Sequence, residues 1–183
     1  MTTQATCQAG DILVTASASL NSTAIQNGTC TTVSHAVLMI DHINAVEAVP
    51  EGVIPSNLSK SLRESSKVIL LRHKHMTHAQ GTRIAQYALK QVGKPYDTLG
   101  AARAGANSGC SGAFKYTAPG MLITLVDELS KSQSGHETSF FCSELVAMAY
   151  RSVGLALSSK QPWVTLPGGL LRSDQLVMVD QLK

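Results

Sequence analysis

The 183-residue sequence has few charged residues, few aromatic residues and no long apolar run. Charged residues make up 15% of the chain, and the formal net charge is +3. Because aromatic residues make up 4% and the basic residues are scattered, the chain offers no stacking platform for bases, and nucleic-acid binding is not expected. No apolar run approaches the roughly 18 residues that a membrane helix needs, so no transmembrane segment is expected.

The N-terminal stretch MTTQATCQAG lacks a basic segment followed by an apolar one. A secretory signal peptide has both features, so the sequence predicts no signal peptide. The protein would then act in the cytoplasm, leave by a route that needs no such signal, or have lost a leader.

Cysteines are few and are not spaced in a metal-binding pattern. The four of them, Cys7, Cys30, Cys110 and Cys142, show no C-x-x-C spacing. In a chain of this length they are too few for a disulfide framework, although a Cys7–Cys30 bridge stays possible. Cys110, in NSGCSGA, is a rival candidate nucleophile, but it opens no helix and follows no clear strand, so we interpret its surroundings as a mobile loop.

Three histidines in RHKHMTH, at His73, His75 and His78, resemble a metal site in their spacing. No acidic residue lies nearby, and His78 begins a predicted helix. A solvated basic loop is therefore the preferred interpretation. We expect no metal ion and no other cofactor.

The predicted elements run from strands to helices and then to one closing strand. Apolar and β-branched runs predict strands at 10–16, 34–40, from 45 to about Pro50, 67–73 and 174–180, and helical spacing predicts helices at 77–93, at 121–132 and after Cys142. A long Ser/Thr-rich loop is expected over 15–34. This order favours an α+β fold, with an antiparallel sheet packed on one side by helices, in a single domain over residues 1–183.

The stretch TSFFCSELVAMAYRSVG, residues 138–154, places Cys142 on the first turn of a predicted helix, with Thr138 or Ser139 as its cap and Gly154 as its stop. Unpaired N–H groups and the helix dipole favour a thiolate at that place. The simpler interpretation is a small buried hydrophobic residue, because free cysteine is often buried.

A cysteine nucleophile needs a nearby base and a third group that orients the base. His35 opens one buried strand, and Glu47 lies in the next. If the chain turns at about 41–44, Met39 pairs with Ala45, and Glu47 comes within diagonal reach of His35. The alternative is that His35 is a satisfied strand histidine and that Glu47 points to solvent.

Five segments together resemble the circularly permuted branch of the NlpC-type, papain-like cysteine hydrolases, which includes YiiX/YaeF-like proteins and is related to lecithin–retinol acyltransferase-like enzymes. In order they are GDIL, SHAVLMI with His35, VEA with Glu47, QVGKPYD, and FFCSELVAMAY with Cys142. The tail VTLPGGLLRSDQLVMV is similar to the closing segment of the family. In this sequence the histidine precedes the cysteine, as the permutation requires.

The resemblance implies a permuted papain-like fold with Cys142 as the nucleophile, His35 as the general base and acid, and Glu47 as the orienting acid. Tyr96 matches the tyrosine beside the catalytic cysteine, where it would bind substrate or polarise its carbonyl. Asp11 is a second acidic candidate for the orienting role.

The resemblance further implies a cysteine amidase or peptidase that forms a thioester, with peptidoglycan stem peptides as the leading substrate. Without a signal peptide, such an enzyme would be made in the bacterial cytoplasm and exported by a dedicated secretion system to the periplasm or a target cell. An exported antibacterial effector of this kind would have an immunity protein as partner. The alternatives are a lipid-directed thiol hydrolase or acyltransferase, and a non-catalytic binding domain with the same fold.

Overall fold

The described strands form one six-stranded antiparallel sheet. The structure, a computed structural model, describes residues 6–16, 31–106, 138–159 and 161–183. The strand order in the sheet is β4-β3-β2-β1-β5-β6. The strands are β1 (Ile12–Ala16), β2 (His35–Met39), β3 (Asn44–Val49), β4 (Gly52–Asn57), β5 (Lys67–His73) and β6 (Leu176–Gln181).

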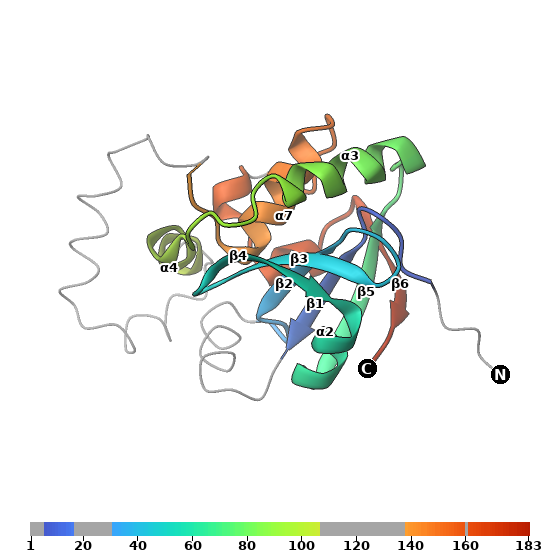
Figure 1. Cartoon of the computed structure of the whole chain (residues 1–183), viewed down its shortest axis with the longest axis horizontal. Helices are drawn as coiled ribbons and strands as arrows, with labels where there is room; N and C mark the ends of the chain where they lie inside the picture. Colours follow the sequence, from blue (N-terminus) through green and yellow to red (C-terminus); the bar gives the residue numbers. More distant parts are fainter. Residues whose placement is uncertain (1–5, 17–30, 107–137, 160) are drawn as a thin grey trace.

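Helices cover both faces of the sheet (Figure 1). Helices α3 (His78–Leu89) and α7 (Cys142–Arg151) pack on one face, and α2 (Leu58–Glu64) packs on the other. Side chains of successive strand residues alternate between the two faces: Val14 of β1 joins the core under α7, whereas Leu13 joins the core under α2. Burial on both sides explains why β1 and β2 appear in the sequence as continuous apolar runs.

The remaining described helices contact α7, β1 or one another. They are α4 (Thr98–Ala106), the short 3₁₀ helix η1 (Pro162–Val164) and α8 (Pro167–Leu171). Within the described ranges, none of the helices is long and apolar enough to cross a membrane.

The predicted α+β class and the antiparallel sheet are confirmed, with two corrections. First, β4 was not predicted, because a single strand was expected to end near Pro50. The chain instead turns there and re-enters through Gly52, whose φ of +122° suits glycine. Pro55 is tolerated because β4 is an edge strand.

The second correction is α2, which places a helix on the face that was expected to lack one. Its signals are present in the sequence: the Asn57 side chain accepts a hydrogen bond from the Lys60 backbone N–H at 2.8 Å, and Leu58 and Leu62 pack on the sheet. The helix has only 7 residues, so its periodicity is too short to stand out.

The helix predicted over 77–93 exists with a shorter C-terminal end, and Thr77 and Gln80 form a capping box at its start. Gly93 adopts a φ of +90° just beyond it. The helix predicted at 121–132, and most of the loop predicted over 15–34, lie outside the described residues.

Candidate active site

Cys142 is the first residue of α7, as the sequence predicts. The predicted cap is wrong: neither Thr138 nor Ser139 caps the helix, and Phe141 occupies the N-cap position. The Phe141 backbone N–H instead donates to Glu144 Oε2 at 3.4 Å, and the Ser143 hydroxyl donates to the Thr165 carbonyl at 2.8 Å. These contacts hold the first turn of α7, on which Cys142 lies.

His35 and Glu47 lie in contact across β2 and β3. The predicted register is confirmed, because Met39 pairs with Ala45 and Val37 pairs with Glu47. From this register the His35 Nε2 and Glu47 Oε2 atoms come within 2.7 Å of each other. The Glu47 side chain is 7% exposed and that of His35 is 26% exposed. Glu47 therefore does not point to solvent.

His35 also interacts with the Cys142 thiol, which is close enough to raise the pKa of the imidazole. Because its Nε2 faces Glu47, Nδ1 is the nitrogen available to the sulfur. Burial alone would lower the pKa of His35, but the contacts with Cys142 and Glu47 outweigh it and raise the pKa to about 10. Burial alone would raise the pKa of Cys142, but the hydrogen bond and charge of His35, with backbone N–H groups of Ala36 and Ser143, lower it. The geometry thus favours a thiolate–imidazolium pair.

Sequence reasoning missed Lys60, the second partner of Glu47. The Lys60 Nζ atom donates to Glu47 Oε1 at 2.9 Å, so each carboxylate oxygen has a cationic or imidazole partner. Burial opposes ionisation of Glu47, but His35 and then Lys60 hold its pKa down to about 2. The signal for Lys60 lies in α2, which was itself not predicted.

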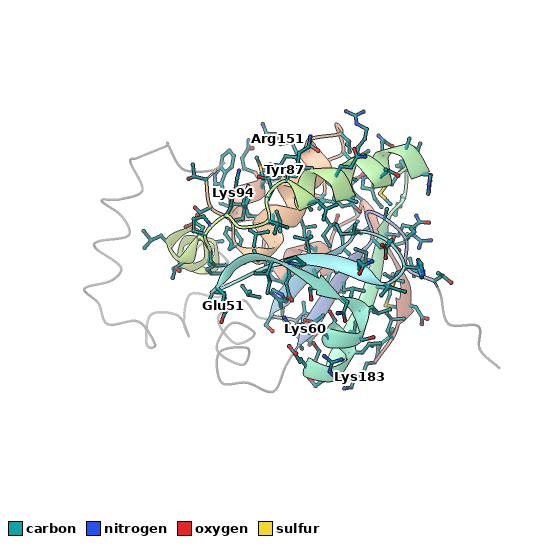
Figure 2. All side chains as sticks on the ribbon, viewed as in Figure 1. Glu51, Lys60, Tyr87, Lys94, Arg151 and Lys183 are labelled. Atoms are coloured by element: carbon teal, nitrogen blue, oxygen red, sulfur yellow. The ribbon has the colours of Figure 1, made fainter. Side chains whose placement is uncertain are left out.

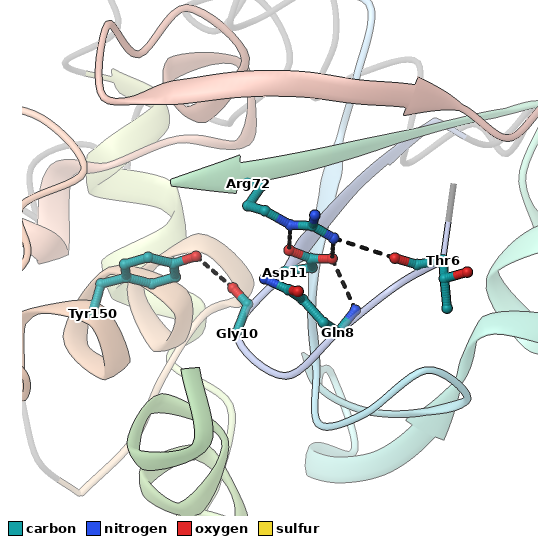
Figure 3. A network of polar contacts seen from close by, with 6 residues as sticks. All are labelled: Thr6, Gln8, Gly10, Asp11, Arg72 and Tyr150. Carbon is teal, nitrogen blue, oxygen red and sulfur yellow. Dashed lines mark hydrogen bonds and ion pairs between the residues drawn. The ribbon is translucent and has the colours of Figure 1, made fainter. Parts of the chain in front are cut away.

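Asp11 lies at the opposite end of β1 and contacts a different partner (Figure 3). Both of its carboxylate oxygens accept hydrogen bonds from Arg72, each at 2.7 Å. Along the sheet, Thr15 pairs with His35, whereas the Asp11 carbonyl accepts from the Met39 N–H. The structure therefore brings Glu47, and not Asp11, to the imidazole of His35.

Tyr96 lies beside the start of α7, as predicted. It forms a parallel bridge with Phe140, and the Asp97 N–H donates to the Phe140 carbonyl at 3.0 Å. Burial, and then the negative charge of Cys142, raise the pKa of Tyr96, so it remains a neutral phenol that can donate a hydrogen bond.

The other sequence candidates lie elsewhere. His73 is buried rather than solvated, since it is 5% exposed, and its Nδ1 accepts from the His75 backbone N–H. Cys7 is a buried free thiol, whereas Cys30 and Cys110 lie outside the described residues. Over the described ranges, no three His, Cys, Asp or Glu side chains are grouped so that they could hold a metal ion.

The sheet, the order of its strands and the late cysteine helix define the permuted papain-like class of α+β folds. A family model described as "Permuted papain-like amidase enzyme, YaeF/YiiX, C92 family" matches residues 6–103, more than half of the chain. The chain belongs to this family of amidases. The matched range includes His35, Glu47 and Tyr96, and Cys142 follows it.

Individual relatives agree with this assignment. The chain is 28% identical over 171 residues to a protein of Escherichia coli K12 named "Probable lipoprotein peptidase YaeF". The alignment covers 88% of this chain but 62% of that protein, so the chain spans less than two thirds of its relative. The crystal structure of a protein titled metalloprotein YiiX, from Escherichia coli O157:H7, matches with a TM-score of 0.65 at 21% identity, covering 97% of this chain and 98% of that one. This second likeness shows the fold.

Proposed function

We propose that this chain is a cysteine amidase or peptidase in which Cys142 is the nucleophile, His35 the general base and acid, and Glu47 the orienting acid. One observation carries the proposal: a single imidazole lies 2.7 Å from a buried carboxylate and interacts with a thiol on the first turn of a helix. Such a chain of nucleophile, base and orienting group is the arrangement that nucleophilic catalysis requires.

In the proposed reaction the Cys142 thiolate attacks the carbonyl carbon of an amide. The oxyanion that forms is stabilised by backbone N–H groups at the start of α7 and by the Tyr96 hydroxyl. His35 gives its proton to the leaving amine, and a thioester remains on Cys142. His35 then takes a proton from water, and the resulting hydroxide attacks the thioester. The Cys142 thiolate leaves as the carboxylic acid product forms, which restores the thiolate–imidazolium pair.

The proposed substrates are peptidoglycan stem peptides, a choice supported by the amidase description of the family and by the resemblance of the sequence to NlpC-type hydrolases. Export as an antibacterial effector, with an immunity protein as partner, stays a prediction.

The test is incubation of the protein with purified muropeptides, followed by mass spectrometry of the products. For each cleaved amide, the summed mass of the products should exceed that of the muropeptide by one water. We expect no such products with Cys142→Ala, and the same products as wild type with the matched control Cys7→Ala. Turnover of acyl esters without any cleavage of amides would instead assign the site to a lipid-directed hydrolase. Lack of turnover on either substrate, together with a Cys142 thiol that is inert to iodoacetamide at neutral pH, would indicate a binding domain.

A further inference from the structure

Lys60 is the least expected member of the cluster around His35. It comes from α2, on the face of the sheet opposite α7, where Figure 2 labels it beneath the strands. Its side chain is 32% exposed, yet its Nζ reaches the 7% exposed carboxylate of Glu47 at 2.9 Å. The flexible Lys60 side chain thus forms an ion pair with a buried acid, although its ammonium group could instead be solvated by water.

The contact determines which Glu47 oxygen faces His35. Lys60 holds Oε1, so Oε2 is directed at the His35 Nε2 atom at 2.7 Å. With both oxygens held, the carboxylate cannot rotate about its terminal bond without breaking one of the two contacts. A rigid carboxylate in turn fixes the tautomer and orientation of the imidazole.

We propose that Lys60 is a positioning residue of the active site, which acts through Glu47 to hold His35 in line with Cys142. This inference rests on the proposed function of the Cys142–His35 pair and adds a fourth member to it. Lys60 touches neither the thiol nor the substrate in this scheme, so it is not a catalytic residue.

The positive charge of Lys60 shifts the pKa of nearby groups in a known direction. The charged groups around it are Glu47 on β3, Glu64 on α2 and Glu51 in the turn between β3 and β4, with His35 beyond Glu47. Removing one positive charge makes proton loss harder for every neighbouring group. Loss of Lys60 should therefore raise the pKa of the Cys142 thiol, and a loosened His35 would raise it further.

The structure offers a matched set of variants. Lys60→Met removes the charge and keeps a side chain of similar length, whereas Arg63→Met removes an exposed charge from the same helix. Lys60→Arg restores a donor, and a cavity of about 230 Å³, lined by Lys60, Glu47, His35 and neighbours, gives the larger guanidinium room.

The experiment measures the rate of Cys142 alkylation by iodoacetamide from pH 4 to 10 in the folded proteins, with melting temperature and amide turnover alongside. In Lys60→Met we expect the midpoint of the alkylation profile to rise by about half to one pH unit and turnover to fall about fivefold. Arg63→Met should leave both unchanged, and Lys60→Arg should restore the midpoint.

The alkylation readout separates the two hypotheses because it needs no substrate. If the wild-type profile resembles that of an ordinary thiol, the proposed function fails, and the role of Lys60 fails with it. If the wild-type thiol is activated but Lys60→Met keeps the wild-type midpoint, the positioning role of Lys60 is wrong while the proposed function survives. A drop in melting temperature with an unshifted midpoint would assign Lys60 a purely structural role.

Discussion

Two regions at opposite ends of β1 and β2 each contain a buried cysteine, a buried acid and a cation. At one end Cys7 lies near Asp11 and Arg72. At the other end Cys142 lies against His35, which contacts Glu47. The two thiols are about equally buried, at 4% and 7% exposed, so burial cannot distinguish them.

The partner of each thiol decides its chemistry. Burial and then the negative charge of Asp11 raise the pKa of Cys7 to about 11, against a smaller opposing effect of Arg72. At Cys142 the hydrogen bond and charge of His35 overcome burial and lower the pKa. The surroundings of the same residue type at similar depth thus disfavour the thiolate at one end and favour it at the other.

The cations also differ in what they can do with a proton. A guanidinium does not lose its proton in proteins, so the Asp11–Arg72 pair is a permanent ion pair that joins the residue before β1 to β5. An imidazole can both accept and donate a proton. The Glu47–His35 contact therefore belongs to a site that can move a proton, and the Asp11–Arg72 contact does not.

The sharpest test of this difference is the loss of either member of the thiol–imidazole pair. Cys142→Ala and His35→Ala should each lower turnover by at least about a thousandfold, and the double variant should add little, because both groups serve one step. Turnover and melting temperature are measured for all three proteins. Near-wild-type activity in a folded His35→Ala protein would refute the pair, and additive losses would mean that the residues act in separate steps.

The second test compares the two thiols directly by alkylation at pH 7. Cys142 should react at least about a hundredfold faster than Cys7, because a pKa near 11 leaves Cys7 almost wholly protonated. The rate at Cys142 should level off at a pH below the value of about 8.5 for a free thiol, whereas the rate at Cys7 should keep rising. Peptide mapping after brief, substoichiometric labelling identifies the modified residue, and faster labelling of Cys110 or Cys7 would move the nucleophile.

The third test concerns the orienting acid. Glu47→Gln should lower turnover by at least about tenfold with the fold intact, because an amide holds the imidazole without stabilising its positive charge. Turnover is compared with that of Asp11→Asn, which should lose much less. The reverse ranking would give the orienting role to Asp11.

Much of this arrangement can be predicted from local sequence. The start of α7 at Cys142 and the Met39–Ala45 register follow from apolar spacing and a short turn. That register alone brings Glu47 within reach of His35. Predictions of this kind succeed because the contacts join neighbouring strands or lie within one helix.

The missed features depend on contacts between distant parts of the chain. Whether Glu47 or Asp11 faces His35 could not be decided from spacing, because Arg72, which holds Asp11, lies 61 residues further along the chain. Lys60 reaches Glu47 from a helix of 7 residues, too short to be recognised by its period. The cap of α7 is a backbone-to-Glu144 contact at a position where a Ser or Thr side chain was expected.

The last test, Asp11→Asn, concerns the end of the strands that contains Cys7. We expect it to have the smallest effect on turnover. Turnover should change less than about threefold, while the free energy of unfolding falls by about 2 to 3 kcal/mol. This loss is below the value for a fully buried ion pair, because Arg72 is 29% exposed and water partly compensates it. Denaturant unfolding measures the stability change, with Arg72→Met as the partner variant. If the pair only stabilises the fold, the double variant should be little less stable than either single variant.

A large loss of turnover in a stable Asp11→Asn protein would mean that this end of the sheet also takes part in the chemistry.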